Sequence, residues 1–127
     1  MRDPWNPTEA EVRAWAYQPH AMCEEDWHLA LPGNGYDELY LDLVADHACP
    51  NRGFFLEVLY LLVGDAVRTG YRREGREHVE ELLERALATG HPDLALWAER
   101  SRALMARPEM FDYDPWCGGG LARTPRE

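Results

Sequence analysis

Residues 54–67 form the longest apolar stretch of the chain, and hydrophobic side chains occupy nearly every side of a helix drawn through it. The polar positions in and just after this stretch fall on one narrow stripe: Glu57, Gly64, Asp65 and Arg68. A helix that is polar along only one stripe is typical of the centre of a bundle, because its other sides must be buried. The pattern predicts an all-α protein around a central helix that Pro50 opens and that ends near Gly70.

Shorter helices are predicted on both sides of the central one. Apolar spacing and proline positions indicate five of them, over residues 8–17, 23–31, 36–48, 76–89 and 92–107. Thr8 and Glu11 have the spacing of a capping box at the start of the first, and His47 falls on the apolar face of the third. No segment alternates for long enough to predict a strand. We therefore expect about six helices, with extended arms at both termini.

Two parts of this helical pattern form a weak internal repeat. Residues 44–63 align with residues 86–105 at an offset of 42, which places Pro50 over Pro92. Each half reads helix, short turn with proline, helix, and the period lies in the range of HEAT and armadillo repeats. Over residues 36–106 the chain resembles a short HEAT-like α-solenoid, although a compact bundle of two antiparallel hairpins would show nearly the same pattern. The resemblance implies protein binding and implies no catalytic residues.

Composition sets the size and the broad class of the protein. A chain of 127 residues with 46% hydrophobic residues is enough for one domain with one core, which we assign to residues 1–116, with 117–127 as a flexible tail. The formal net charge of −10 argues against nucleic acid as a partner, since phosphate contacts need clustered cations. No leader of the charged-then-apolar type opens the chain, and the central apolar run is too short for a membrane span. We expect a cytoplasmic protein without a cofactor.

The negative charge is concentrated in the first 50 residues, which hold ten acids and two arginines. Six of these acids form two groups on predicted helices: Glu24, Glu25 and Asp26, and then Glu38, Asp42 and Asp46 at intervals of four. Runs of like charge are usually solvated faces of a helix. The alternative is an anionic surface that steers a basic protein partner to the molecule. On that alternative, these six residues bind the partner.

Two of the five tryptophans, Trp5 and Trp116, each end an Asp-Pro-Trp triplet in a terminal arm. One interpretation is that each indole fastens its arm to the domain, because terminal residues become ordered through such docking. The other is that an arm presents its tryptophan as an interface anchor, a favoured hot-spot residue. The second interpretation adds Trp116 to the candidate partner-binding residues.

One set of residues has metal-compatible donors: His20, Cys23, His47 and Cys49. Neither pair has the Cys-x-x-Cys spacing of common zinc sites, and a histidine on an apolar face is more often a core residue. The set nevertheless defines an alternative function, that of a small metal- or thiol-dependent enzyme or sensor. The single serine, Ser101, lies on the inward face of its predicted helix and outside any nucleophile turn.

The sequence therefore favours a non-enzymatic protein-binding module over an enzyme. Small size, acidity and the lack of a complete catalytic motif are shared by immunity and antitoxin proteins, which mask a basic surface of a toxin. This version of the hypothesis rests on likeness in size and charge rather than on a recognised site.

Overall fold

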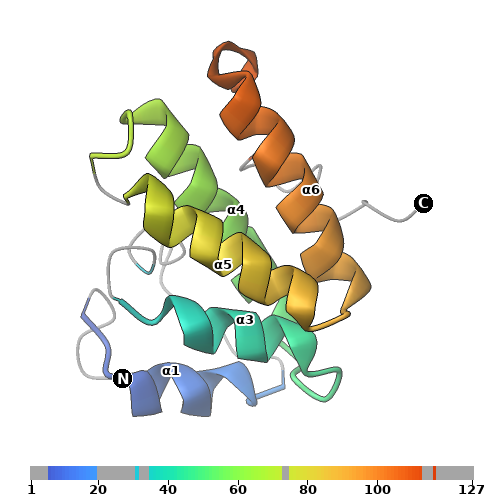
Figure 1. Cartoon of the computed structure of the whole chain (residues 1–127). Coiled ribbons are helices and arrows are strands. Elements are labelled where there is room, and N and C mark those ends of the chain that lie inside the picture. The colour runs from blue at the N-terminus through green and yellow to red at the C-terminus, as the bar shows by residue number, and fades with distance from the viewer. Residues whose placement is uncertain (1–5, 20–30, 32–34, 73–74, 113–115, 117–127) are drawn as a thin grey trace.

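The computed structural model describes residues 6–19, 31, 35–72, 75–112 and 116. Its helices are α1 (Glu9–Ala16), α3 (Asp37–Ala45), α4 (Arg52–Arg68), α5 (Arg76–Ala88), α6 (Pro92–Ala106) and the 3-10 helix η2 (Pro108–Met110) (Figure 1). The described part of the chain contains no strand, which confirms the all-α prediction. The helix predicted over 23–31 lies, apart from the buried Leu31, outside the described residues, as do the first five residues and the predicted tail at 117–127.

Helix α4 is the centre of the molecule, as its sequence predicts. It packs against α3, α5 and α6, and the side chains of Phe55, Leu59 and Leu62 are completely buried. Helices α3 and α4 form one hairpin and α5 and α6 another, with α5 crossing in front of α4 in Figure 1. The burial of apolar side chains on most sides of α4 supplies the main driving force for this arrangement.

The polar stripe predicted on α4 is wrong at Gly64. Glu57 and Asp65 are half-buried and Arg68 is exposed, but Gly64 is buried under the rings of Phe111 and Trp116. The missing side chain at Gly64 lets these two aromatic rings rest on the helix backbone. Phe111 and Trp116 from the C-terminal part of the chain therefore cover this stripe of α4 at Gly64.

The helix ends follow from local hydrogen bonding, and they correct one prediction. Helix α4 ends in a Schellman motif, in which Gly70 has a φ of 64° and the Tyr71 N–H donates to the Ala66 carbonyl at 2.7 Å. Helix α3 ends at Ala45, earlier than predicted, because the Asp46 carboxylate accepts the Ala48 N–H at 2.9 Å in a competing turn. His47 consequently lies outside the helix and is exposed, so its predicted place on an apolar face is wrong.

Helix α1 begins and ends with side-chain caps. The predicted capping box is confirmed, since Thr8 and Glu11 exchange hydrogen bonds at 2.9 and 3.1 Å. At the other end, the Asn51 amide donates to three carbonyls of the last turn and beyond: Trp15 at 3.0 Å, Ala16 at 3.2 Å and Gln18 at 3.0 Å. The Trp15 carbonyl also accepts the Gln18 N–H at 3.1 Å and the Ala16 carbonyl also accepts the Cys49 thiol at 3.3 Å, so the Asn51 amide adds to the bonds that complete this helix end.

Ser101 on α6 carries a buried hydroxyl for which the described residues offer no hydrogen-bond partner. An unsatisfied buried hydroxyl costs about 1–3 kcal/mol, and alanine also has the higher helix propensity. We therefore expect Ser101→Ala to stabilise the protein by about 1 kcal/mol in urea denaturation. Ala103→Ser at an exposed position of the same helix is the control for propensity alone. A loss of stability in Ser101→Ala would mean that the hydroxyl has a partner.

Candidate functional site

The negative charge of the folded domain is concentrated on α3 and α5. These two helices carry seven acids and two arginines, a formal charge of −5, whereas α4 and α6 each carry two acids and two arginines. We define the acidic surface as the exposed carboxylates of α3 and α5: Glu38, Asp42, Glu77, Glu80, Glu81 and Glu84. The two helices lie next to each other on the side of the molecule that faces the viewer in Figure 1.

Two ion pairs join α3 to α5, one to the buried Asp37 and one to the exposed Glu38. His78 Nε2 lies 2.6 Å from Asp37 Oδ2, and Arg85 Nη1 lies 3.1 Å from Glu38 Oε1. Asp37 is buried, and desolvation raises the pKa of its carboxyl group, while the bond and the charge of His78 act in the opposite direction. The contacts fix the position of α5 relative to α3, so that acids from two segments far apart in the sequence share one surface.

Asp46 has a structural place in the fold. Its carboxylate accepts the Tyr17 hydroxyl at 2.6 Å and the Ala48 N–H at 2.9 Å. The Tyr17 bond, followed by the Ala48 bond, lowers the pKa of Asp46 below its ordinary value of 3.8. Because these bonds hold its carboxylate at the junction of α1 and α3, we leave Asp46 out of the acidic surface.

The Tyr17–Asp46 bond predicts a pH dependence. Because the folded-state pKa of Asp46 is lowered, its contribution to stability is present above pH 3.8 and is lost as the pH falls through the lowered pKa. The same bond raises the pKa of Tyr17 from 10.0 to about 12, so this contribution is also lost as the pH rises from 10 toward 12. We expect Tyr17→Phe to move the carboxyl titration of Asp46 upward, as measured by NMR.

Tyr36→Phe is the matched control for that titration. The Tyr36 hydroxyl donates to the Pro7 carbonyl at 3.1 Å and not to a carboxylate, so its loss should leave the Asp46 titration in place. An unchanged Asp46 midpoint in Tyr17→Phe would show that the hydroxyl does not hold the carboxylate in solution.

Of the other five acids predicted to bind a partner, two lie among the described residues and three do not. Glu38 and Asp42 are exposed on α3 and belong to the acidic surface, whereas Glu24, Glu25 and Asp26 lie outside the described residues. The acids of α5 were not among the predicted partner-binding residues. The acidic polar face of the predicted helix over 76–89 was the available signal, but the sequence alone did not show that it would lie beside α3.

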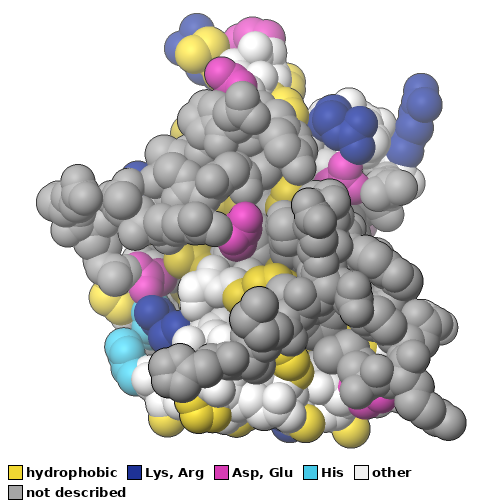
Figure 2. All heavy atoms as spheres, turned by 180° about the vertical axis from the view of Figure 1, so that it is seen from behind, with side chains coloured by type: hydrophobic (Ala, Val, Ile, Leu, Met, Phe, Trp, Pro, Cys, Tyr) yellow, Lys and Arg dark blue, Asp and Glu magenta, His cyan; other side chains and the backbone are white. Residues whose placement is uncertain are grey.

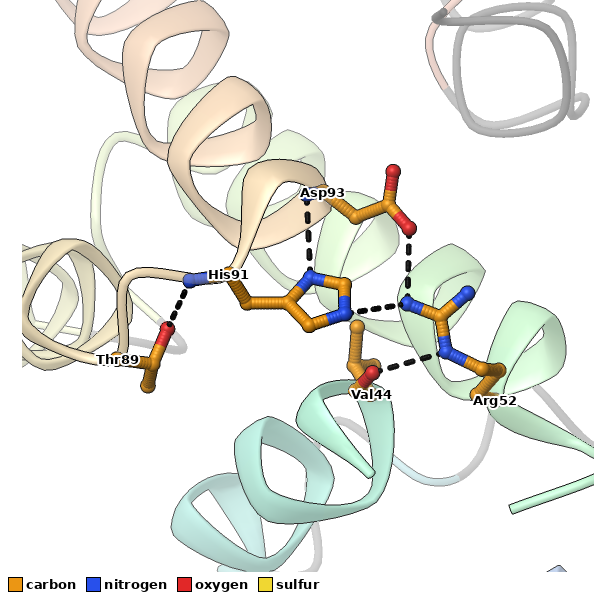
Figure 3. A network of polar contacts seen from close by, with 5 residues as sticks. All are labelled: Val44, Arg52, Thr89, His91 and Asp93. Carbon is orange, nitrogen blue, oxygen red and sulfur yellow. Dashed lines mark hydrogen bonds and ion pairs between the residues drawn. The ribbon is translucent and has the colours of Figure 1, made fainter. Parts of the chain in front are cut away.

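A polar network at the other end of α3 holds the two hairpins together (Figure 3). Arg52, the first residue of α4, donates from Nε to the Val44 carbonyl of α3 at 3.0 Å and from Nη2 to Asp93 of α6 at 2.8 Å. Nη2 also lies 2.9 Å from Nε2 of His91, the N-cap of α6, and the His91 N–H donates to Thr89 Oγ1 at 3.1 Å. One guanidinium thus joins the end of α3 to the start of α6.

Figure 2 views the molecule from the side opposite to that of Figure 1. Figure 2 shows dark blue and magenta side chains interspersed among hydrophobic ones in the coloured part of that view. By element, the excess of negative charge lies on α3 and α5, whereas the charges of α4 and α6 balance. A charge asymmetry of this kind sets a preferred side for approach by a charged partner.

The predicted metal set is described only in part. Cys49 is 1% exposed, its thiol donates to the Ala16 carbonyl at 3.3 Å, and burial raises its pKa. His47 is exposed and its ring lies 4.9 Å from that of His91. Among the described residues there is no group of three or more potential metal ligands. His20 and Cys23 lie outside these residues, so the set of four stays a prediction.

Trp116 is 7% exposed and lies against α4. Its Nε1 donates to the Tyr60 carbonyl at 2.7 Å, and its ring meets the Tyr60 ring at 5.1 Å and 69°, an edge-to-face arrangement. This is the geometry of an indole that fastens the C-terminal arm to the domain. Trp116 would have to leave α4 before it could act as an anchor for another protein.

Comparison of the chain with protein-family models, with curated proteins and with solved structures gives no match in any of the three. No helix in the described part of the chain is both long and apolar enough to cross a membrane. Function is therefore inferred from the residues of the site and their arrangement.

Proposed function

We propose that this protein is a non-enzymatic protein-binding module and that its acidic surface binds a basic partner protein. The observation that carries the proposal is the charge of −5 on α3 and α5, next to two helices whose charges balance. Like charges on neighbouring helices repel each other and cost stability, so such a surface is not explained by the stability of the domain itself. A basic partner would relieve this repulsion and would be steered toward the surface.

One version of this proposal is an immunity- or antitoxin-type protein that masks a basic toxin surface. In the same proposal, the two hairpins α3–α4 and α5–α6 correspond to a HEAT-like pair of repeats, an architecture suited to protein binding. Support for the second part comes from Pro50, which precedes the N-cap of α4, and Pro92, the first residue of α6: each lies close to the start of the second helix of its hairpin.

The test is partner capture by two variants of equal charge. Asp42→Arg with Glu81→Arg alters the acidic surface, and Glu99→Arg with Glu109→Arg alters exposed acids of α6 and η2. Each reversal adds two positive units, so both double variants change the formal net charge from −10 to −6. Proteins captured by the wild type from a lysate of the source cells are identified, and the main one is purified for affinity measurements.

We expect the acidic-surface variant to bind the purified partner at least about tenfold more weakly, a loss of about 1.4 kcal/mol, and the control variant to bind within about twofold of the wild type. Wild-type binding should also weaken as salt rises, because exposed charges are screened. Equal losses in both variants would attribute binding to net charge alone, and no loss in either would remove the acidic surface from the proposal.

A further inference from the structure

The place where Trp116 meets α4 is shaped for an indole ring. A Cβ atom built on Gly64 would lie 2.9 Å from Trp116 Cδ1, closer than Cβ atoms approach other atoms, and 3.0 Å from Phe111 Cε1, which is tighter than most such contacts. Glycine is thus the residue at this position of α4 that lets the rings reach the backbone. We call the site formed by Tyr60, Gly64 and Phe111 the Trp slot.

The chemistry of the slot selects tryptophan among the aromatic residues. The indole N–H donates to the Tyr60 carbonyl at 2.7 Å, a bond that phenylalanine lacks altogether and that a tyrosine hydroxyl would have to make from a different position. The edge-to-face contact with the Tyr60 ring adds a second geometric requirement. Arg100 of α6 donates to the Tyr60 hydroxyl at 3.3 Å, so the ring that the indole contacts is itself held by a hydrogen bond.

The chain contains the tripeptide that carries this indole twice. Asp114-Pro115-Trp116 supplies the ring seen in the slot, and Asp3-Pro4-Trp5 repeats the same three residues in the same order near the N-terminus. A site that recognises a tryptophan after Asp-Pro does not distinguish the two by these residues. The N-terminal copy therefore carries, in Trp5, the same indole in the same local sequence.

We propose that the Trp slot is a binding site for a tryptophan side chain, that Trp116 fills it within one molecule, and that Trp5 of a second molecule binds it when Trp116 is withdrawn. The balance favours the internal copy, because a short tether from Phe111 gives Trp116 an effective concentration in the millimolar range. Self-association through the slot is thus suppressed in the intact chain and released by loss of Trp116.

The test uses the full-length Trp5→Ala/Trp116→Ala variant, in which neither internal tryptophan can compete. Two peptides are added at 1 mM: residues 1–9, and residues 111–119 with Cys117→Ser to prevent oxidation. A ligand that binds only the folded state raises the melting temperature by mass action, and we expect both peptides to raise it by at least about 4 °C. Peptides with tryptophan replaced by phenylalanine should have no effect.

Two controls locate the effect. Adding Gly64→Val to the same variant should abolish the shift, because the new side chain would occupy the space of the indole. The wild type should not respond to the N-terminal peptide, since its slot is filled. If the double variant is unfolded at 25 °C, peptide-induced helix formation, followed by circular dichroism, gives the same comparison.

Several outcomes would overturn the proposal. A response to the C-terminal peptide alone would show that the slot recognises residues other than the tryptophan, and no response to either would show that it is not a binding site. An equal response in the Gly64→Val background would place the binding elsewhere. In sedimentation experiments, Trp116→Ala should self-associate with rising concentration and Trp5→Ala/Trp116→Ala should not, and equal behaviour of these two variants would also contradict the proposal.

Discussion

Asp93→Ala is expected to destabilise the protein by about 3 kcal/mol. The Asp93 side chain is 3% exposed and forms an ion pair at 2.8 Å with Arg52, whose side chain is 24% exposed. Removing one partner of a buried pair costs about 3–5 kcal/mol because the other charge loses its compensation, and the partial access of water to Arg52 places the effect at the lower end. The measurement is urea denaturation followed by circular dichroism at neutral pH.

Two further variants separate the ion pair from general effects of losing a carboxylate. Asp42→Ala removes an exposed aspartate from α3 and should change stability by no more than about 0.5 kcal/mol. Arg52→Met combined with Asp93→Ala removes both charges. The double variant should lose less stability than the sum of the losses in the two single variants. A double variant with fully additive losses would mean that the pair seen in Figure 3 does not couple α4 to α6.

Gly64→Val is expected to destabilise the protein by about 3 kcal/mol, nearly as much as Trp116→Ala. The valine side chain would collide with the indole, so that Trp116 loses both its packing on α4 and its bond to the Tyr60 carbonyl. A loss of stability would point to the collision with the indole, because replacing a glycine inside a helix ordinarily stabilises the helix by up to about 1 kcal/mol. Stability is again measured by urea denaturation.

The matched control lies on the same helix. Gly53 of α4 is exposed, and a Cβ atom added to it would meet no other atom within 4 Å, so Gly53→Ala should be neutral or stabilising. In Gly64→Val/Trp116→Ala the losses should not add, because both changes empty the same slot; we expect about 3 kcal/mol for the double variant rather than about 6. Additive losses would show that Gly64 and Trp116 act independently.

The sequence predicted the helices of this protein because most of their signals are local. The start of α6 at Pro92 and the span of α5 depend on periodicity and on residues at the helix ends, all of which can be read within one segment. The error at the end of α3 has a local cause of another kind. There, the Asp46 side chain competes with the helix for a backbone N–H, and apolar periodicity does not register that competition.

The candidate site was less predictable because it depends on contacts between distant segments. Acidity could be read from the chain, but the ties from His78 to Asp37 and from Arg85 to Glu38 that bring α5 beside α3 could not. The same holds for Trp116, whose indole meets a carbonyl 56 residues earlier in the chain. From the sequence, Trp116 could either dock on the domain or be exposed as an interface anchor. Only the fold shows that it packs on α4.

The side-chain amide of Asn51 links the C-terminus of α1 to the N-terminus of α4, which has a consequence for local unfolding. Asn51 is the N-cap residue of α4, yet its side chain makes no cap bond to α4 and donates instead to the carbonyls at the end of α1. The Ala16 carbonyl at the end of α1 therefore keeps its bonds to the Cys49 thiol and the Asn51 amide only while the segment that leads into α4 is in place. Native-state hydrogen exchange should accordingly show the end of α1 and the start of α4 opening together, as one cooperative unit of folding.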